Sequence, residues 1–257
     1  MAKVEYGIQM YSLYDVTKDD LKGSLKHVAD LGYKYIEFAG YFGHSAEEIK
    51  SWLDEFGLVC SGAHIGTAAI EDDKIEETIA FHKTLGCMNP ILPGADYTTE
   101  EAMEKTLALI NRAVKTLAKH GMTLGYHNHS NEFMVTPFGK VFEEELIART
   151  DAELEVDTFW VYNAGMDPIP FLEKHKDRIR VIHLKDGLPS PAENKKWIQV
   201  HEGVDRRAIG EGTAPVVAVR EWAMKNNKLM VIESEGITPS GPEEVARCIK
   251  YLRSLEN

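Results

Sequence analysis

The sequence predicts a (β/α)8 barrel, and three observations lead to this fold class. Short apolar strands alternate along the chain with amphipathic helical stretches, which favours parallel strand pairing. Eight such strands can be recognised, and the 257 residues approach the roughly 250 of a complete barrel. No Pro/Gly/Ser-rich linker interrupts the chain. We therefore expect residues 1–257 to form a single barrel domain.

The individual elements follow from local signals. The Ser45/Glu48 and Thr98/Glu101 pairs have capping-box spacing and predict helix starts, and Pro242 suits a first helical turn. Glycines such as Gly57 mark helix ends before strands. An open doubly wound sheet is the alternative, but residues 9–13 lack its Gly-rich loop. The predicted strands are 4–10, 34–39, 58–64, 89–93, 122–129, 153–158, 180–185 and 229–235.

Composition excludes several function classes. The formal net charge of -12 and the pI near 5.3 argue against nucleic-acid binding, because an acidic chain repels a polyanion. Three widely spaced cysteines form no zinc or disulfide pattern, which favours a reducing cytoplasm. The sequence shows no signal peptide and no apolar run of membrane-spanning length. We expect a cytoplasmic protein that does not contact a membrane.

Polar side chains share one face of each late strand. Side chains alternate along a strand, so Glu155 and Asp157 oppose the apolar residues of their own strand. His183 and Glu233 follow the same pattern on the next two strands. The apolar set must pack on the helices, so the polar set faces the barrel axis near the C-terminal strand ends, where barrel enzymes place active sites. We expect Asp157, His183 and Glu233 to form one site.

This residue set suits a metal centre. Asp157, His183 and Glu233, with His127 from strand 5, mix oxygen and nitrogen donors as Mn²⁺, Co²⁺, Fe²⁺ or Zn²⁺ prefer, whereas Mg²⁺ prefers oxygen. One such ion would polarise a carbonyl and stabilise an enediolate. Glu233 is our candidate base, with Glu235, Glu132, His129 and His64 as alternatives. Lys185 is expected either to hold a substrate oxygen or to form a salt bridge to Glu155 or Asp157.

Further residues are assigned from their positions. Trp160 is expected to form an apolar wall for a sugar ring or to pack in the core, and His82 to lie on an exposed helix face. The run Ile209–Gly212 is either a lid or a turn, and loop residues Arg206 and Arg207 are weak phosphate candidates. The residues that we expect to contact the substrate are Glu37, His64, His129, Trp160 and Glu235.

These residues resemble the xylose isomerase-like barrels, also called sugar phosphate isomerases/epimerases. The resemblance rests on an ordered series of motifs that covers almost the whole chain. They are Gly-Ile-Gln-Met-Tyr-Ser (7–12), Tyr-Ile-Glu-Phe-Ala-Gly (35–40), Gly-Tyr-His-Asn-His (125–129), Val-Asp-Thr-Phe-Trp (156–160), Val-Ile-His-Leu-Lys-Asp-Gly (181–187), Ile-Gly-Glu-Gly (209–212) and Val-Ile-Glu-Ser-Glu (231–235).

The resemblance implies a divalent-metal-dependent sugar isomerase or epimerase that works through a metal-stabilised enediolate. In the family's ketose 3-epimerases, Glu, Asp, His and Glu hold one ion, commonly Mn²⁺. Asp157, His183 and Glu233 match, but His127 replaces the first glutamate, which puts a two-glutamate epimerisation in question. His127 then serves as acid, base or ligand. A lyase or epimerase acting on 3-keto sugars or glycosides by β-elimination is the alternative.

Two readings of other classes also follow from the fold. A non-catalytic sugar-binding or partner subunit would carry no metal. A three-zinc DNA repair nuclease would need more His and Asp ligands than the inward face offers, and the acidic charge opposes DNA. The expected partner is a small sugar or sugar derivative, and the family is compatible with a homo-oligomer.

Overall fold

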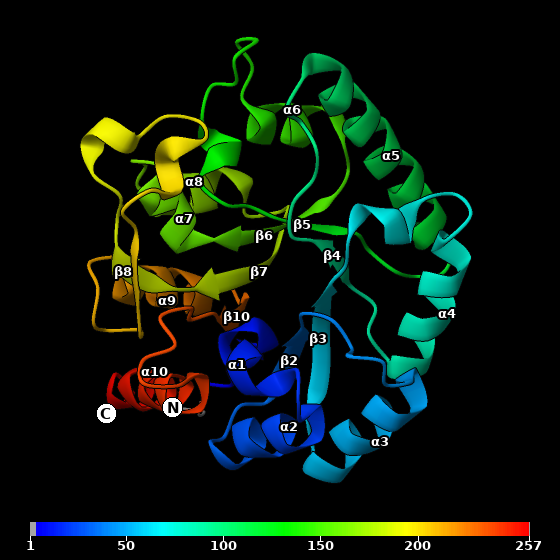
Figure 1. The fold of residues 1–257 in the computed structure, drawn as a ribbon, viewed down its shortest axis with the longest axis vertical. Coiled ribbons are helices and arrows are strands. Elements are labelled where there is room, and N and C mark those ends of the chain that lie inside the picture. Colours follow the sequence, from blue (N-terminus) through cyan, green and yellow to red (C-terminus); the bar gives the residue numbers. More distant parts are fainter. Residues whose placement is uncertain (1–3, 257) are drawn as a thin grey trace.

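The computed structural model describes residues 4–256, in which eight parallel strands close into a barrel. Each barrel strand pairs with the next barrel strand along the chain, and the last pairs with the first. This confirms the predicted fold class, and Figure 1 shows helices arranged around the strands. The barrel strands are β1 (Gly7–Gln9), β2 (Tyr35–Phe38), β3 (Val59–His64), β4 (Pro90–Leu92), β5 (Gly125–His127), β6 (Glu153–Asp157), β7 (Ile179–Leu184) and β10 (Leu229–Ile232).

Helices cover the outside of the barrel, and short 3-10 turns lie in several connections. Buried apolar side chains fill the layer between strands and helices, including Ile8, Ile36, Val156 and Ile182. The helices are α1 (Tyr14–Thr17), α2 (Leu21–Asp30), α3 (Ala46–Phe56), α4 (Ile75–Leu85), α5 (Glu100–Ala118), α6 (Phe142–Arg149), α7 (Thr158–Asn163), α8 (Pro168–His175), α9 (Val216–Lys225) and α10 (Gly241–Ser254). The 3-10 turns are η1 (Met10–Leu13), η2 (Thr67–Ile70), η3 (Asn131–Phe133), η4 (Ala192–Asn194) and η5 (Gln199–His201).

The local signals hold at most helix ends. Ser45 caps α3 with the complete predicted box, and Gly57 ends that helix in the left-handed conformation with φ 69°. The predicted Thr98 cap is wrong by one residue, because Thr99 accepts the hydrogen bond from the Ala102 amide. His82 on α4 is buried, not exposed as predicted, because its ring bonds the Thr78 carbonyl and the Tyr41 hydroxyl.

A small antiparallel hairpin in the connection from β7 to α9 was not predicted. It pairs β8 (Asp186–Leu188) with β9 (Asp205–Arg207) and stands outside the barrel. Residues 189–204 between its strands carry η4 and η5 and run beside α7, where Asn163 donates to the Val200 carbonyl at 2.9 Å (Figure 1, yellow). The strands are too short to show an apolar alternation that sequence could reveal.

The segment Ile209–Gly212 is a fixed turn and not a free lid. The Asp186 carboxylate accepts hydrogen bonds from the amides of Gly210, Gly212 and Ala214 at 2.9–3.1 Å. These bonds tie the turn to the start of β8. As for membrane insertion, no helix within residues 4–256 combines the length and the apolar character that a span requires.

Candidate metal and catalytic centre

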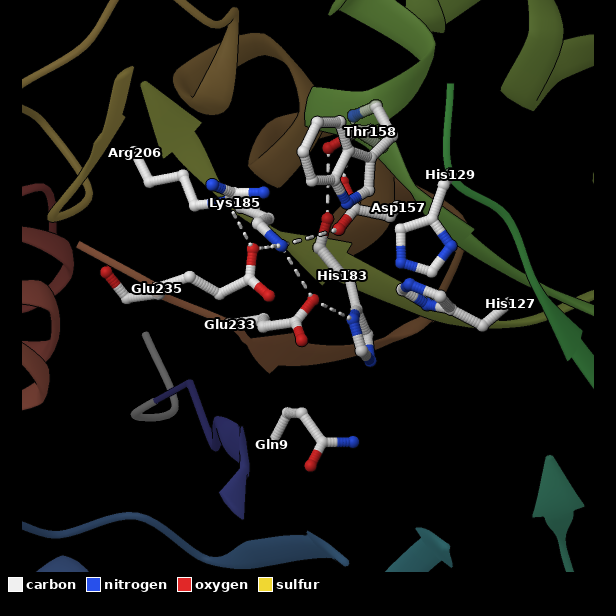
Figure 2. A network of polar contacts seen from close by, with 12 residues as sticks. Gln9, His127, His129, Asp157, Thr158, His183, Lys185, Arg206, Glu233 and Glu235 are labelled. Atoms are coloured by element: carbon white, nitrogen blue, oxygen red, sulfur yellow. Dashed lines mark hydrogen bonds and ion pairs between the residues drawn. The ribbon is translucent and has the colours of Figure 1, made fainter. Parts of the chain in front are cut away.

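Four side chains from four successive barrel strands converge at the C-terminal mouth. His127 ends β5, Asp157 ends β6, His183 lies on β7 and Glu233 follows β10. One ligand atom from each lies within 4.8 Å of the others, and all four side chains are buried. Sequence alternation predicted this inward-facing group, and the structure brings all four together (Figure 2).

Strand register and backbone contacts set the height of each residue. Asp157 pairs with His183 between β6 and β7, and His127 pairs with Glu155 between β5 and β6. The Asn128 side chain accepts from the Asp157 amide at 3.1 Å and donates to its carbonyl at 3.2 Å. Thr158 donates to the His183 carbonyl at 3.0 Å. The middle residue of the His-Asn-His motif therefore holds two strand ends in place.

Two atoms of this group lack hydrogen-bond partners among the described residues. Asp157 Oδ1 caps α7 by accepting from the Trp160 amide at 3.0 Å, which leaves Oδ2 buried and unpaired. His127 Nδ1 is also unpaired, although Glu155 Oε1 lies 3.3 Å away. Leaving such groups unpaired costs about 1–3 kcal/mol each. Buried nitrogen and oxygen donors within 4.8 Å of one another fit a divalent cation with mixed ligands.

A second layer of polar residues lies beneath the first. Glu37 accepts from Gln9 at 2.7 Å and lies 2.8 Å from His183 Nε2. His64 Nε2 lies 2.7 Å from Glu155 Oε1 and 3.1 Å from Glu37 Oε1. His64, Glu155, His127 and His183 form a second set with ligand atoms within 4.8 Å of one another.

The electrostatics of this lower layer are those of ion pairs. Burial opposes charge on His64, but Glu155 and Glu37 outweigh it and raise the pKa of His64 to about 10. Burial likewise opposes ionisation of Glu37, and the neighbouring His183 and His64 still hold its pKa well below the usual range. The same two carboxylates, with Glu233, outweigh burial and raise the pKa of His183 well above its usual range. Both imidazoles therefore carry a proton in the metal-free protein, and a metal that binds His183 must displace its proton.

The upper layer contains a buried cation, Lys185. Its Nζ lies 2.6 Å from Glu235, 3.2 Å from Glu233 and 3.8 Å from Asp157 (Figure 2), and 4.7 Å from the centre of the Trp160 ring. The predicted salt bridge to Asp157 is therefore long. The alternative partner Glu155 is wrong, because it binds the histidines of the lower layer.

The proposed ligands also have shifted pKa values. Burial raises the pKa of Asp157 to about 7, against the opposing effect of Lys185. Burial lowers the pKa of His127 well below its usual range, so its imidazole is neutral. Burial opposes ionisation of Glu233, but Lys185 and His183 hold its pKa well below normal. A neutral imidazole and an ionised carboxylate are the forms that bind metals.

An open cavity of about 470 Å³ lies above these residues. Of the predicted substrate contacts, His64, His129 and Glu235 line it, together with His127 and Glu233. Glu37 and Trp160 are missing from its described lining. Glu37 lies below His183, where it orients that ring, and Trp160 is buried against Lys185. Burial lowers the pKa of His129 to about 3, so its imidazole is neutral at the cavity wall.

The weak phosphate candidates are already paired. Arg206 Nε donates to Glu235 at 2.9 Å, and its guanidinium lies 5.5 Å from the Trp160 ring centre. Arg207 is paired with Asp205 at 2.6 Å. Glu132 lies outside the main cavity, where it accepts from the His129 amide at 2.9 Å.

Sequence reasoning missed three residues that support the site. Gln9 binds Glu37, Asn128 joins two strand ends, and Asp186 fixes the turn after the hairpin. All three lie within the motifs named above, and that position was the signal in the sequence that could have identified them. Their roles depend on backbone amides and on neighbours distant in sequence.

The fold and this constellation define the class of protein. The chain belongs to the xylose isomerase-like TIM barrel family, whose model matches residues 25–255. Among curated relatives, an inosose dehydratase of Mesomycoplasma hyopneumoniae (strain 7448) is 26% identical over 90% of this chain and 87% of its own length. An inosose dehydratase of Geobacillus kaustophilus (strain HTA426) is 24% identical over 63% of this chain; that match spans 60% of the relative's length.

Solved structures agree with this membership. A sugar phosphate isomerase/epimerase from Parabacteroides distasonis ATCC 8503 superposes with a TM-score of 0.79 at 26% identity, covering 97% of this chain and 98% of that one. D-Psicose 3-epimerase from Clostridium cellulolyticum H10 has a TM-score of 0.65 at 14% identity, covering 98% of this chain and 99% of that one, and shares the fold. The relatives are named as enzymes, and the chain is placed among the enzymes of this family.

Proposed function

We propose that this protein is a divalent-metal-dependent enzyme that removes a proton from the carbon beside a carbonyl of a sugar, leading to isomerisation or epimerisation. His127, Asp157, His183 and Glu233 would hold the ion. The observation that carries the proposal is the buried cluster of two imidazoles and two carboxylates at the barrel mouth, whose ligand atoms lie within 4.8 Å of one another and in which Asp157 Oδ2 has no hydrogen-bond partner among the described residues.

The chain's own residues supply the acid–base chemistry. A bound divalent cation supplies Lewis acidity, which favours proton loss beside a carbonyl. Glu233 is the proposed base, because it lines the cavity and its lowered pKa keeps it ionised. Lys185, whose Nζ lies 3.2 Å from the cavity-lining Glu233, is proposed to donate a hydrogen bond to a substrate oxygen that becomes negative. His127 is proposed as a ligand and as a second proton carrier.

A lyase is the second candidate, and two observations favour it. His127 stands where ketose 3-epimerases carry a second glutamate, so the residue that would return a proton on the opposite face is changed. The curated relatives are dehydratases by name. Removal of the same proton, followed by departure of a group on the next carbon, gives an unsaturated ketone. Both outcomes share the first step and the same base.

Manganese is the proposed ion. The mixed donor set suits Mn²⁺, Co²⁺, Fe²⁺ or Zn²⁺ better than Mg²⁺. We propose one ion per chain, because His127 and His183 belong to both ligand sets, so the two sets cannot each hold an ion of their own. Elemental analysis of the purified protein checks this. Three ions per chain would instead support a nuclease, and a chain that binds no ion would refute the proposal.

The test is proton exchange in deuterated water. Ketoses, 3-keto sugars and their glycosides are incubated with the protein and Mn²⁺, and NMR follows the proton beside the carbonyl. We expect exchange of that proton with at least one substrate, and the accumulating product distinguishes epimer from unsaturated ketone. Glu233→Gln should slow exchange by about 10²–10⁴-fold. Unchanged exchange in this variant, with metal retained, would remove Glu233 from the mechanism.

A further inference from the structure

A second cavity adjoins the proposed centre and has a different character. It has a volume of about 360 Å³, within the range of small-molecule sites. Three connections build it: residues 94–98 before α5, residues 129–132 after β5, and residues 197–201 within the excursion between β8 and β9. His129 lines both this cavity and the main one. The two cavities therefore meet at one side chain.

The walls of the second cavity offer apolar surface. Tyr97 and Trp197 contribute aromatic rings whose centres are 6.2 Å apart, with an interplanar angle of 46°. Ile198 is 76% exposed, an unusual state for a large aliphatic side chain beside a cavity. Gly94 and Ala95 add little bulk. A flat apolar group would cover Ile198 and lie against the rings.

The polar atoms of this cavity are largely occupied by one another. His201 Nε2 lies 2.8 Å from Asn131 Oδ1, and the Asn131 amide donates to the Tyr97 hydroxyl. Glu132 accepts from the His129 amide and from Tyr126 at 3.3 Å. Among the described lining residues there is neither lysine nor arginine. A phosphate group would find no cationic partner there.

We infer that the second cavity is a binding subsite for a planar apolar substituent carried by the sugar, so that the substrate is an aryl glycoside with a ketone on its sugar ring and not a sugar phosphate. This inference rests on the proposed function for the position of the sugar itself. The sugar ring would occupy the main cavity beside Glu233, and its aglycone would pass His129 to reach Tyr97, Trp197 and Ile198.

Binding measured without turnover tests the inference. Calorimetry compares phenyl and methyl β-glycosides of glucose, galactose, mannose and xylose with the Mn²⁺-loaded protein. For at least one sugar we expect the phenyl glycoside to bind about tenfold or more tightly than the methyl glycoside. Equal affinities for every pair, or no detectable binding of any phenyl glycoside, would overturn the inference.

Variants locate the preference. Trp197→Ala and Ile198→Asp should each reduce the phenyl preference by about fivefold or more, and Ile198 is exposed enough for its variant to fold. Met224→Ala on α9, which removes a 42% exposed side chain, is the matched control and should keep the preference. A preference that survives both cavity variants would refute the subsite.

The same experiment separates this inference from the proposed function. Glu233→Gln should lose proton exchange and keep the phenyl preference, because Glu233 lines only the main cavity. A phenyl preference without exchange on any substrate would overturn the proposed function and leave the subsite standing. Proton exchange without a phenyl preference would overturn the subsite and leave the proposed function standing.

Discussion

The two overlapping ligand sets make opposite predictions for substitutions on a single strand. Asp157 and Glu155 lie two residues apart on β6 and both face the barrel axis, but only Asp157 belongs to the upper set and only Glu155 to the lower one. We predict that Mn²⁺ stabilises the wild-type protein and Glu155→Gln, and fails to stabilise Asp157→Asn. Within residues 4–256 both carboxylates have one unpartnered oxygen, but Glu155 Oε1 already lies within 3.3 Å of three histidines, His64, His127 and His183. Asp157 has no such contact with a described histidine, so we expect it, and not Glu155, to take up the ion.

The expected size of the Mn²⁺-dependent gain in Tm follows from the thermodynamic linkage between ion binding and folding. A ligand that binds only the folded state stabilises it by about 2.7 kcal/mol at one hundred times its Kd. Unfolding entropy is roughly 2.1 cal/mol/K per residue, so a 257-residue chain should gain about 5 °C in Tm. Removing one carboxylate ligand should reduce this gain to about 1 °C or less at the same Mn²⁺ concentration.

Differential scanning fluorimetry with and without Mn²⁺ measures the gain for each variant. The comparison within each variant matters, because both substitutions alter buried charges and will lower the Tm of the metal-free protein. His64→Gln provides a second check on the lower set and should keep the gain. A gain that persists in Asp157→Asn and disappears in Glu155→Gln would refute the assignment of the ion to the upper set.

Three further predictions concern the scaffold. Lys185→Met leaves Glu233 and Glu235 without their buried cation, so urea denaturation should reveal a loss of about 3–5 kcal/mol; a loss below about 1 kcal/mol would contradict the ion-pair network. Burial and nearby Glu132 raise the pKa of Glu143 to about 8 from an ordinary 4.5. The folded state therefore binds the Glu143 proton more tightly than the unfolded state does, and stability falls as the pH rises from 4.5 to 8. Glu143→Gln should remove about 3 kcal/mol of the fall between pH 5 and 8 in urea melts, and an unchanged pH profile would contradict this. Asp186→Asn weakens the bonds that hold residues 210–214, so hydrogen exchange of those amides should speed up by about tenfold, while exchange at the wild-type rate would mean that the turn is fixed by other contacts.

The ligand group was accessible from sequence because strand geometry is periodic. Asp157 and His183 each alternate with apolar neighbours, and parallel strands of a barrel bring their C-terminal ends to the same mouth. That reasoning requires no knowledge of side-chain contacts. It could not assign partners, so Glu155 and Asp157 were the salt-bridge partners considered for Lys185, whereas Glu233 and Glu235 lie closest and Asp157 lies 3.8 Å away.

Other features depended on contacts between distant segments. His82 on α4 is buried because it meets Tyr41, which lies 41 residues earlier. The β8–β9 hairpin closes across residues 189–204, and Asp186 binds the amide of Gly210, which lies 24 positions later. Contacts between segments so far apart in the sequence leave no periodic pattern in either segment.

The sequence by itself determined the order of the eight barrel strands, the closed parallel barrel and the inward direction of His127, Asp157, His183 and Glu233, because side-chain alternation is a local property of the backbone. Only the tertiary structure decided which of these polar atoms find partners. It left Asp157 Oδ2 and His127 Nδ1 unpaired, paired His64 with two carboxylates, and opened an apolar cavity beside His129. Hydrogen bonding and burial depend on the relative positions of whole strands and loops, which no local pattern specifies.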